Sequence, residues 1–484
     1  MLIPLDPSNP IPLYRQIADW LEVHVCNGSL PADTRLPATR GLAKELGVSR
    51  ITVENAYSIL QSTGLLVTRE GSGTYVSSYV TQLTQETKPS QKTWPLWQTD
   101  RVSNEKLIIP FSQNSGSLDV NLISFTGVGD ASQYPTRDLL AAAQTVFRKE
   151  GDRALDYGPF GQGYAPLCST ICSILASQGI HASPEHVLIT TGSQQGLALV
   201  CHHLLREGDV ILVEKPTYNL ALALFSLLGI KIIDVPTDEK GMLVETIEPL
   251  LQKYHPRLIY TIPNFQNPGG TCLSLARRRL LLSLAACYNI PIVEDDFAGD
   301  LRFEGRGIPA IKALDHSGQV IYLGTFSKML APGLRVGYLA AEGPVFQGLE
   351  TQKILNDLTT SPLLQQVLNQ YMTLGRYQTH LHRSIRLYRK RRDILVDALK
   401  NHLPQLDFQI PQGGLFLWVR LPEGKPSSVF LAYARAEGVE FSPGSLFFSN
   451  PLEGENFFRM NFATNDPQRI LNGVQRLACA FDKF

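Results

Sequence analysis

One lysine, Lys328, stands in the stretch GTFSKMLAPGLRVG among small and hydroxylated residues. The apolar run VIYLGTF that leads into it is typical of a strand that ends in a loop. A lysine that forms a Schiff base must lose its proton and hold a carbonyl carbon, so it favours an enclosed, partly apolar place with fixed charges nearby. A lysine after a strand is more often a surface charge, so the choice between these two interpretations depends on the other residues.

A cluster of acids ends a second apolar strand, in PIVEDDFAGD. Glu294, Asp295 and Asp296 come at the carboxyl end of this strand, and ligands bind at that edge of open α/β sheets. A carboxylate there could hold a proton on a pyridine nitrogen, the proton that makes pyridoxal phosphate an electron sink. Both Asp295 and Asp296 remain candidates for that role, and acids at a helix N-terminus are the alternative interpretation.

Other strands end in residues that suit the rest of such a ligand. VLITTGSQQGLALV opens a helix at Gly192, Ser193 and Gln194, where free backbone amides and the positive helix end could hold a phosphate. VEKPTYNLA supplies Tyr218, whose aromatic face could stack on a ring.

A turn and two arginines complete the set. TIPNFQNPGGT holds Asn267 in a turn that contains proline and glycine. Arg335 and Arg459 are isolated among apolar neighbours, where an arginine is rarely found without an anion to bind.

The elements that must position these residues follow one another in a regular alternation. The strand-like segments HVLIT, DVILVE, KIIDVP, RLIYTIP, PIVEDD, VIYLGTF and RVGYLAA are separated by amphipathic stretches, which predicts crossover units on a mostly parallel sheet. From about residue 362 a long basic helix, RSIRLYRKRRDILVDALKNHL, is mixed with the strands GLFLWVRL and FFRMNF. We therefore expect an α/β fold with a smaller C-terminal α+β subdomain.

Residues 12–76 have a different pattern, which predicts three helices and a hairpin. PLYRQIADWLEVHVCNG is helical to Asn27 and Gly28, and TRGLAKELGVSRITVENAYSILQSTG gives two helices joined through Gly47. This is helix-turn-helix spacing, and LLVTREGSGTYVS adds two strands around a glycine-rich turn, a wing.

In such a module the second helix enters the major groove of DNA, and the wing contacts phosphates. The candidate DNA-binding residues are Arg40, Ser49, Arg50, Thr52, Asn55, Arg69, Gly71 and Gly73. Because local basic and acidic residues balance, a small helical domain that binds protein is the alternative.

The bulk composition sets limits on the whole chain. Its 484 residues carry no formal net charge, so DNA contact requires a local basic patch. No apolar run approaches the roughly 20 residues of a membrane span, and the N-terminus lacks a secretory signal, so we expect a cytoplasmic protein.

Seven cysteines without metal-ligand spacing predict no metal site. The polar segment after residue 78 predicts three parts: residues 1–78, a linker 79–118, and residues 119–484.

Two resemblances follow from these motifs. The stretch LPATRGLAKELGVSRITVENAYSILQSTGLLVTREGSGTYV resembles the winged helix of GntR-type bacterial regulators. The region from about residue 120 to 480 resembles the fold-type I aminotransferases, and the order winged helix, linker, aminotransferase-like domain is similar to the MocR group of GntR regulators. The resemblance implies pyridoxal 5'-phosphate as cofactor and a homodimer that binds double-stranded DNA.

The resemblance also implies a role for each site residue. Lys328 would form the internal aldimine, Asp295 would pair with the pyridine nitrogen, and Asn267 would bond the phenolic oxygen. The residues implied at the phosphate are Gly192, Ser193, Gln194, Thr325, Ser327 and Arg335, with Tyr157 of DYGPFGQG nearby. Tyr218 would stack on the ring, and Arg459 would take the carboxylate of an effector or substrate.

One position departs from the family pattern. The motif usually reads Glu-Asp-Asp-Tyr, but Phe297 stands here in place of the tyrosine, whose hydroxyl bonds the phenolic oxygen. The loss of one hydrogen bond costs about 0.5–1.5 kcal/mol, so cofactor binding is expected to survive, whereas efficient transamination is in doubt.

Three functions are consistent with these features. The first is a transcriptional regulator that senses a small amino compound by aldimine chemistry and repositions its winged helices through the linker. The second is an active aminotransferase with an accessory DNA-binding domain. The third is a DNA-binding protein whose second domain is an inactive scaffold, which leaves the retained lysine, carboxylate and phosphate cradle unexplained. The winged helix and Phe297 favour the regulator, with at most residual transamination.

Overall fold

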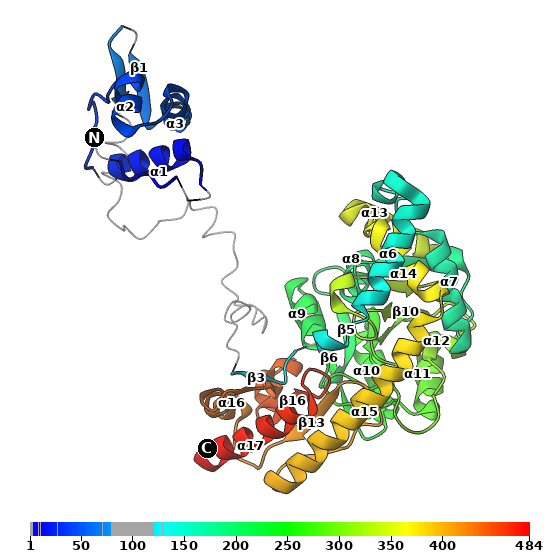
Figure 1. The fold of residues 1–484 in the computed structure, drawn as a ribbon. Coiled ribbons are helices and arrows are strands. Elements are labelled where there is room, and N and C mark those ends of the chain that lie inside the picture. Colours follow the sequence, from blue (N-terminus) through cyan, green and yellow to red (C-terminus); the bar gives the residue numbers. More distant parts are fainter. Residues whose placement is uncertain are drawn as a thin grey trace. The chain divides into compact units, whose positions relative to one another are not determined.

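The structure is a computed structural model that describes residues 3–78 and 121–484, apart from residues 8, 10, 27, 70 and 128. The chain divides into two compact units, Met1–Lys106 and Leu107–Phe484, and each is described by itself (Figure 1). The predicted linker, residues 79–118, lies outside the described residues.

The N-terminal unit has the predicted order of three helices and a hairpin. Its elements are α1 (Leu13–Cys26), α2 (Thr39–Leu46), α3 (Arg50–Ser62), β1 (Leu66–Arg69) and β2 (Gly73–Val76). Gly47 ends α2 with a left-handed φ of 70°, which glycine adopts without strain. Ser49 caps α3, because its Oγ accepts a 3.1 Å hydrogen bond from the backbone N–H of Thr52.

A small core holds these helices and the hairpin together. Ile17 and Leu21 of α1, Leu42 of α2 and Val53 of α3 are fully buried, and Val76 of β2 packs in the same cluster. The apolar positions recur at helical spacing, so one face of each helix is buried against the others. The orientation of α2 and α3 is thereby fixed within this unit.

The second unit is built on an eight-stranded sheet in the order β4-β11-β10-β9-β8-β5-β6-β7. Its strands are β4 (Val187–Thr190), β5 (Val210–Lys215), β6 (Lys231–Asp238), β7 (Gly241–Met242), β8 (Leu258–Thr261), β9 (Ile292–Asp296), β10 (Val320–Thr325) and β11 (Gly337–Ala340). The neighbours β10, β9, β8, β5 and β6 pair in parallel, whereas β11 is antiparallel to both β10 and β4. The prediction of a mostly parallel sheet is confirmed.

Helices surround this sheet, as Figure 1 shows. They are α6 (Thr136–Glu150), α7 (Ala165–Ser177), α8 (Ser193–Leu204), α9 (Asn219–Leu227), α10 (Ile247–Tyr254), α11 (Leu275–Cys287), α12 (Ile311–Leu314), α13 (Pro344–Asp357) and α14 (Pro362–Thr373). Every residue of β4, β8, β9, β10 and β11 is buried, as expected for strands covered on both faces. No helix in the described part of the chain is long and apolar enough to cross a bilayer.

A smaller α+β subdomain follows, as predicted. It contains α15 (Arg376–His402), β12 (Asp407–Phe408), β13 (Phe416–Arg420), α16 (Ser427–Ala436), β14 (Val439–Glu440), β15 (Ser442–Pro443), β16 (Phe457–Asn461) and α17 (Pro467–Lys483). The strands β12, β13, β16 and β15 form an antiparallel sheet in that order. β14 pairs in parallel with β3 (Ile123–Ser124), at the start of the second unit.

Candidate functional site

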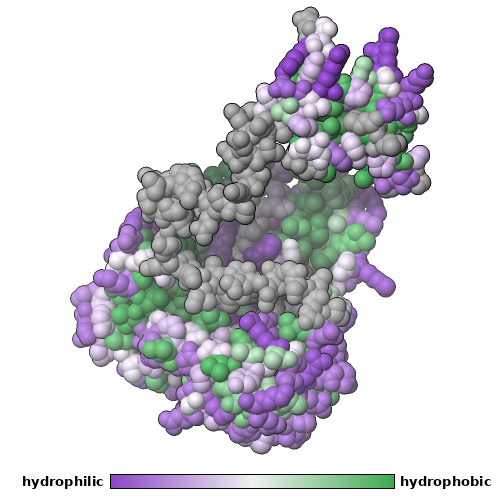
Figure 2. Space-filling model, turned by 90° about the vertical axis from the view of Figure 1, so that its left-hand side faces the viewer, coloured by the Kyte–Doolittle hydropathy of each residue, from purple (hydrophilic) through white to green (hydrophobic). Residues whose placement is uncertain are grey.

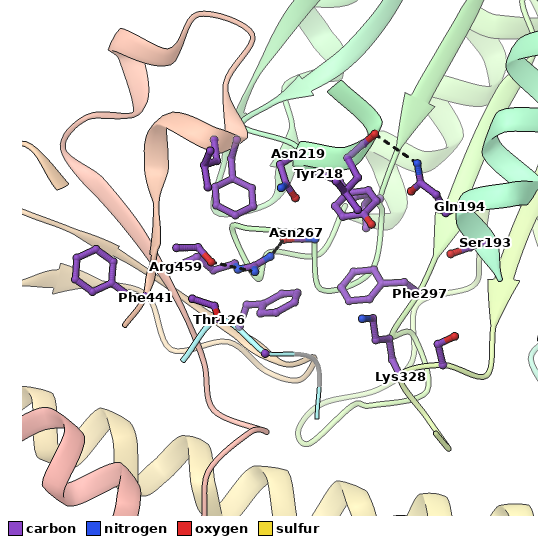
Figure 3. Close-up of a pocket in the computed structure, with 18 of the residues that line it drawn as sticks. Thr126, Ser193, Gln194, Tyr218, Asn219, Asn267, Phe297, Lys328, Phe441 and Arg459 are labelled. Carbon is purple, nitrogen blue, oxygen red and sulfur yellow. Dashed lines mark hydrogen bonds between the residues drawn. The ribbon is translucent and has the colours of Figure 1, made fainter. Parts of the chain in front are cut away.

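A cavity of about 510 Å³ lies in the second unit and brings together every predicted cofactor and effector residue except Tyr157. Figure 3 shows side chains from the central sheet and from the C-terminal subdomain converging on it. Its size falls in the range of roughly 300–1,000 Å³ that is usual for small-molecule and cofactor sites.

Lys328 lies in the turn that follows β10, where the strand ends at Thr325. The turn is held by a 3.2 Å hydrogen bond from the backbone N–H of Ser327 to Oγ1 of Thr325. Burial lowers the pKa of Lys328 to about 8, and the positive charges of Arg459 and Arg335 act in the same direction. This ammonium group can therefore lose its proton near neutral pH, as a Schiff-base lysine must.

Asp295 lines this cavity, whereas Asp296 is not among its lining residues. Successive side chains of β9 point to opposite faces of the sheet. Oδ2 of Asp295 accepts a 2.8 Å hydrogen bond from Tyr260, whereas Oδ2 of Asp296 accepts one of 2.8 Å from Tyr322 on the other side. Oδ1 of Asp295 is buried and has no partner among the described residues. Burial raises the pKa of Asp295 to about 6.

The phosphate candidates gather where β4 passes into α8. Gly192 has φ +85°, and a Cβ there would lie 2.8 Å from Nη2 of Arg335, so any side chain at this position would strain the backbone and displace Arg335. Arg335 donates to the carbonyl of Thr191 at 3.0 Å and to Oγ of Ser327 at 3.4 Å. The free N–H groups at the start of α8, the hydroxyl of Ser193 and this exposed guanidinium are groups that can bind an anion.

Arg459, on β16, lines the cavity and is buried against two aromatic rings. Its guanidinium carbon lies 4.0 Å from the ring centre of Phe416 and 4.8 Å from that of Phe447. Nη1 donates to Oδ1 of Asn267 at 2.8 Å, while Nε is buried without a partner among the described residues. Burial lowers the pKa of Arg459 to about 10, so the group is still a cation at neutral pH. It can take an anion.

Two rings border the space between these charges. Tyr218 precedes α9 and lines the cavity, and burial raises its pKa, so its hydroxyl stays neutral. Phe297 follows β9 directly and stacks on Phe416 with ring centres 5.9 Å apart. Figure 3 shows Phe297 beside Lys328.

Tyr157 lies outside this cavity. Its side chain is 68% exposed and its ring centre lies 6.0 Å from that of Phe160. Within one chain it is not brought to the predicted phosphate position.

The structure adds residues that sequence reasoning missed. Tyr260 lies on β8 and supports Asp295 across the sheet. Gln195 donates to Oδ2 of Asp357 at 2.7 Å and accepts a 2.7 Å bond from the backbone N–H of Thr191, so the end of α13 holds the segment between β4 and α8 in place. The apolar residues around Tyr260 predict a strand, but they do not predict which strand lies beside it. Nothing in the sequence predicts that Gln195 pairs with Asp357.

Five of the DNA-binding candidates lie on α2 and α3 or, in the case of Ser49, directly before α3. Arg40, Arg50 and Asn55 are exposed, and the hydroxyls of Ser49 and Thr52 are 2.8 Å apart. Nε of Arg50 lies 2.6 Å from Oε1 of Glu54, so part of its charge is compensated. These side chains can reach bases or phosphates, as the helix-turn-helix pattern predicts.

The hairpin carries the remaining candidates. Arg69 pairs with Asp33 and lies over the ring of Tyr75 at 4.7 Å. Gly71 and Gly73 both have positive φ, and a Cβ on Gly73 would meet the guanidinium of Arg35 at 3.3 Å. The upper end of this unit, where Figure 1 draws the hairpin, is largely hydrophilic in Figure 2. The wing therefore offers polar groups to a charged partner.

Comparison with known proteins agrees with this division. Residues 127–477 match the family Aminotransferase class I and II, and residues 13–76 match Bacterial regulatory proteins, gntR family. The chain is 33% identical over 484 residues to the uncharacterized HTH-type transcriptional regulator YisV of Bacillus subtilis, covering 97% of this chain and 96% of that protein. It is 30% identical to the probable rhizopine catabolism regulatory protein MocR of Rhizobium meliloti, covering 99% and 96%.

Enzymes and their structures match the second unit. The aromatic-amino-acid aminotransferase 1 of Thermococcus litoralis is 37% identical over 74% of this chain and 87% of that enzyme. The crystal structure of LysN, an alpha-aminoadipate aminotransferase of Thermus thermophilus complexed with N-(5'-phosphopyridoxyl)-L-leucine, covers 75% of this chain and 92% of its own at 36% identity, with a TM-score of 0.71. The chain belongs to the aminotransferase class I and II family, joined to an N-terminal domain of the gntR family of bacterial regulators, as in the MocR-type regulators.

Proposed function

We propose that the protein is a transcriptional regulator that binds DNA through its winged helix and responds to a small amino compound in a cavity that holds pyridoxal 5'-phosphate. One observation carries the proposal: a DNA-reading fold and a buried Lys328–Asp295 site stand on the same chain. The proposed parts are the winged helix 1–78, the linker 79–118 and the effector domain 119–484. DNA binding implies action in the bacterial cytoplasm, where the DNA is.

The residues of the cavity fit the cofactor. The unpartnered Oδ1 of Asp295 lacks a donor that a protonated pyridine nitrogen would supply. Gly192, Ser193 and Arg335 suit its phosphate, with Gln194, Thr325 and Ser327 around them. Tyr218 would stack on the ring, and the amide nitrogen of Asn267 remains to donate to the phenolic oxygen. When bound, the cofactor supplies a carbonyl carbon that exchanges its partner amine and a ring that withdraws electrons.

The protein's own groups would then select and hold the effector. Arg459 binds a carboxylate in a water-poor place, where a charged hydrogen bond is strong. Lys328 would hold the cofactor through Nζ, which must be deprotonated to do so, and the free amine could accept a proton once an effector amine has taken its place. An effector thus changes contacts at Lys328 and Arg459 together, and such differential contact is what an allosteric response requires.

An active aminotransferase is the second candidate, supported by the 37% identity to an enzyme. Phe297 weighs against efficient turnover because Asn267 alone would then hold the phenolic oxygen. The winged helix is a domain that amino group transfer does not need. The regulatory function is therefore preferred.

We also propose a homodimer. Leu155, Tyr157, Phe160 and Leu355 are each more than half exposed, and the backbone N–H of Gly161 bonds to the carbonyl of Leu358, so the loop before Gly161 lies against the end of α13. Such an apolar surface favours a second copy as partner. Dimerisation would cover it and could bring Tyr157 to the phosphate of the other copy, and two winged helices would read paired half-sites.

Borohydride trapping tests the cofactor part of the proposal. The purified protein, given pyridoxal 5'-phosphate and then reduced, should carry the added mass on the peptide that contains Lys328. Lys328→Ala should lose the label and the visible absorbance band, whereas removal of the exposed Lys400 should change neither. A label on another lysine, or none, would remove Lys328 from the site.

A further inference from the structure

The same cavity is also lined by residues that take no part in the proposed cofactor contacts, and we call this part of it the outer compartment. It is bordered by Leu220 of α9, Leu431 and Arg435 of α16, Glu440 of β14, and Leu446 and Phe447 near β15. In Figure 3, Arg459 stands between Lys328 with Phe297 on one side and Phe441 on the other. A ligand whose amino group is at Lys328 and whose carboxylate is at Arg459 can direct its side chain into this compartment.

The walls of the outer compartment are mostly aliphatic and aromatic. Leu431 and Arg435 are one helical turn apart and share a face of α16. Phe447 also forms one of the two rings that enclose the guanidinium of Arg459. Burial of an apolar side chain against such walls is favourable because it removes apolar surface from water.

Arg435 and Glu440 are the only charged residues among the described residues that border the outer compartment, and their opposite charges compensate each other. Nη2 of Arg435 lies 2.6 Å from Oε1 of Glu440. Oε2 of Glu440 accepts a 3.3 Å hydrogen bond from the hydroxyl of Ser124, which holds the carboxylate in place. The remaining cations of the described lining, Lys328, Arg335 and Arg459, lie at the proposed amine, phosphate and carboxylate positions. A second ligand carboxylate would therefore meet Glu440 without a free cation.

We propose that the effector is an α-amino acid with an uncharged aliphatic or aromatic side chain, and that the Arg435–Glu440 pair excludes amino acids with a second carboxylate. This inference rests on the proposed function, since it takes Lys328 and Arg459 as the amine and carboxylate positions. Leu220, Leu431 and Leu446 select the apolar side chain by contact, and Glu440 rejects the acidic one by repulsion. Specificity then has an attractive and a repulsive part.

The test compares two ligands that differ at one end. L-Norleucine and L-2-aminoadipate have the same chain length, but the first ends in a methyl group and the second in a carboxylate. Calorimetric titration of the full chain loaded with pyridoxal 5'-phosphate should give norleucine an affinity about tenfold higher or more. The same titrations are made on Glu440→Gln, which frees Arg435 and keeps an acceptor for Ser124.

Glu440→Gln should raise the affinity for 2-aminoadipate about tenfold and leave that for norleucine nearly unchanged. Glu437→Gln is the matched control, because Glu437 lies on the same segment, pairs with Lys483 at 2.5 Å and does not line the cavity. That variant should keep the wild-type preference. Thermal unfolding of the loaded proteins checks that both variants are folded, and the wild-type preference tests the inference without either variant.

The outcomes separate this inference from the proposed function. Tighter binding of 2-aminoadipate by the wild-type protein would overturn the inference and leave the proposed function standing. An unchanged preference in folded Glu440→Gln would overturn the role of the Arg435–Glu440 pair. Failure of both amino acids to bind the loaded protein would overturn the proposed function together with the inference.

Discussion

Arg459 donates a 2.8 Å hydrogen bond from Nη1 to Oδ1 of Asn267, and this bond joins β16 of the C-terminal subdomain to the turn after β8 of the central sheet. The first residue is the proposed carboxylate position and the second is a proposed cofactor contact. A ligand carboxylate that binds the guanidinium of Arg459 must either share its N–H donors with Asn267 or break the hydrogen bond to Asn267. Effector and cofactor contacts are therefore linked through one buried pair.

Replacement of Arg459 by methionine should abolish carboxylate recognition while it keeps an unbranched apolar side chain between Phe416 and Phe447. We expect a loss of about 2–5 kcal/mol in binding L-norleucine, since a buried charged hydrogen bond is removed. Calorimetry on the loaded protein measures it. Pentylamine, which is norleucine without the carboxylate, should bind both proteins alike; an equal loss for pentylamine would contradict the assignment.

Asp295→Asn should stabilise the protein without cofactor and weaken its hold on the cofactor. Burial raises the pKa of Asp295 to about 6, above the value of about 3.9 in an unfolded chain. The folded protein therefore binds the proton of Asp295 more tightly than the unfolded chain does. The contribution of this proton to the free energy of unfolding is present at low pH and is lost as the pH rises through about 6. Asparagine does not ionise, so the variant should gain about 1–3 kcal/mol in unfolding free energy near pH 8, and the gain should vanish near pH 4.

Urea unfolding of the second unit at both pH values measures this difference, and titration with pyridoxal 5'-phosphate measures the opposite effect on binding. Glu294, whose pKa burial raises to about 7, is present in both proteins, so its own contribution to the pH dependence is common to both. A variant that binds the cofactor as tightly as the wild type would show that Asp295 does not meet the pyridine nitrogen.

Gly192→Ala should damage the phosphate site specifically. The new Cβ would lie 2.8 Å from Nη2 of Arg335, and the backbone there is one that alanine adopts at a cost of about 1–3 kcal/mol. We expect cofactor affinity to fall about tenfold or more because Arg335 must move. Gly333→Ala is the control, since a Cβ there meets nothing within 4 Å. Equal affinity in both variants would exclude Gly192 and Arg335 from the phosphate site.

Arg50→Ala should weaken DNA binding by about 1–3 kcal/mol if Arg50 contacts a base edge, with a change in sequence preference. If it contacts a phosphate instead, binding should weaken on all sequences and the salt dependence should decrease by about one counterion. Fluorescence anisotropy at several salt concentrations distinguishes the two. Arg15→Ala removes an equally exposed, ion-paired arginine from α1 and should leave the affinity intact. Unchanged affinity in Arg50→Ala would remove that residue from the DNA-binding set.

The sequence by itself determined the elements and most members of the site. Helical spacing and caps around Gly47 and Ser49 predicted the helix-turn-helix, and the strand that ends at Thr325 predicted the turn that carries Lys328. These signals are local, because caps, periodicity and turn residues act over a few positions. Parallel strands collect their carboxyl ends at one edge, so the sequence could also predict that Asp295, Ser193 and Lys328 would meet.

Only the tertiary structure decided which groups are left without partners. The direction of Asp295 depends on the pleat of β9 and on Tyr260 of β8, and the pairing of Asn267 with Arg459 joins segments 192 residues apart. The same holds for the Arg435–Glu440 pair facing the outer compartment, and for Tyr157, which the fold leaves exposed. Burial, strand register and the spacing of distant segments fix pKa values and unpaired atoms, and no local pattern of residues encodes them.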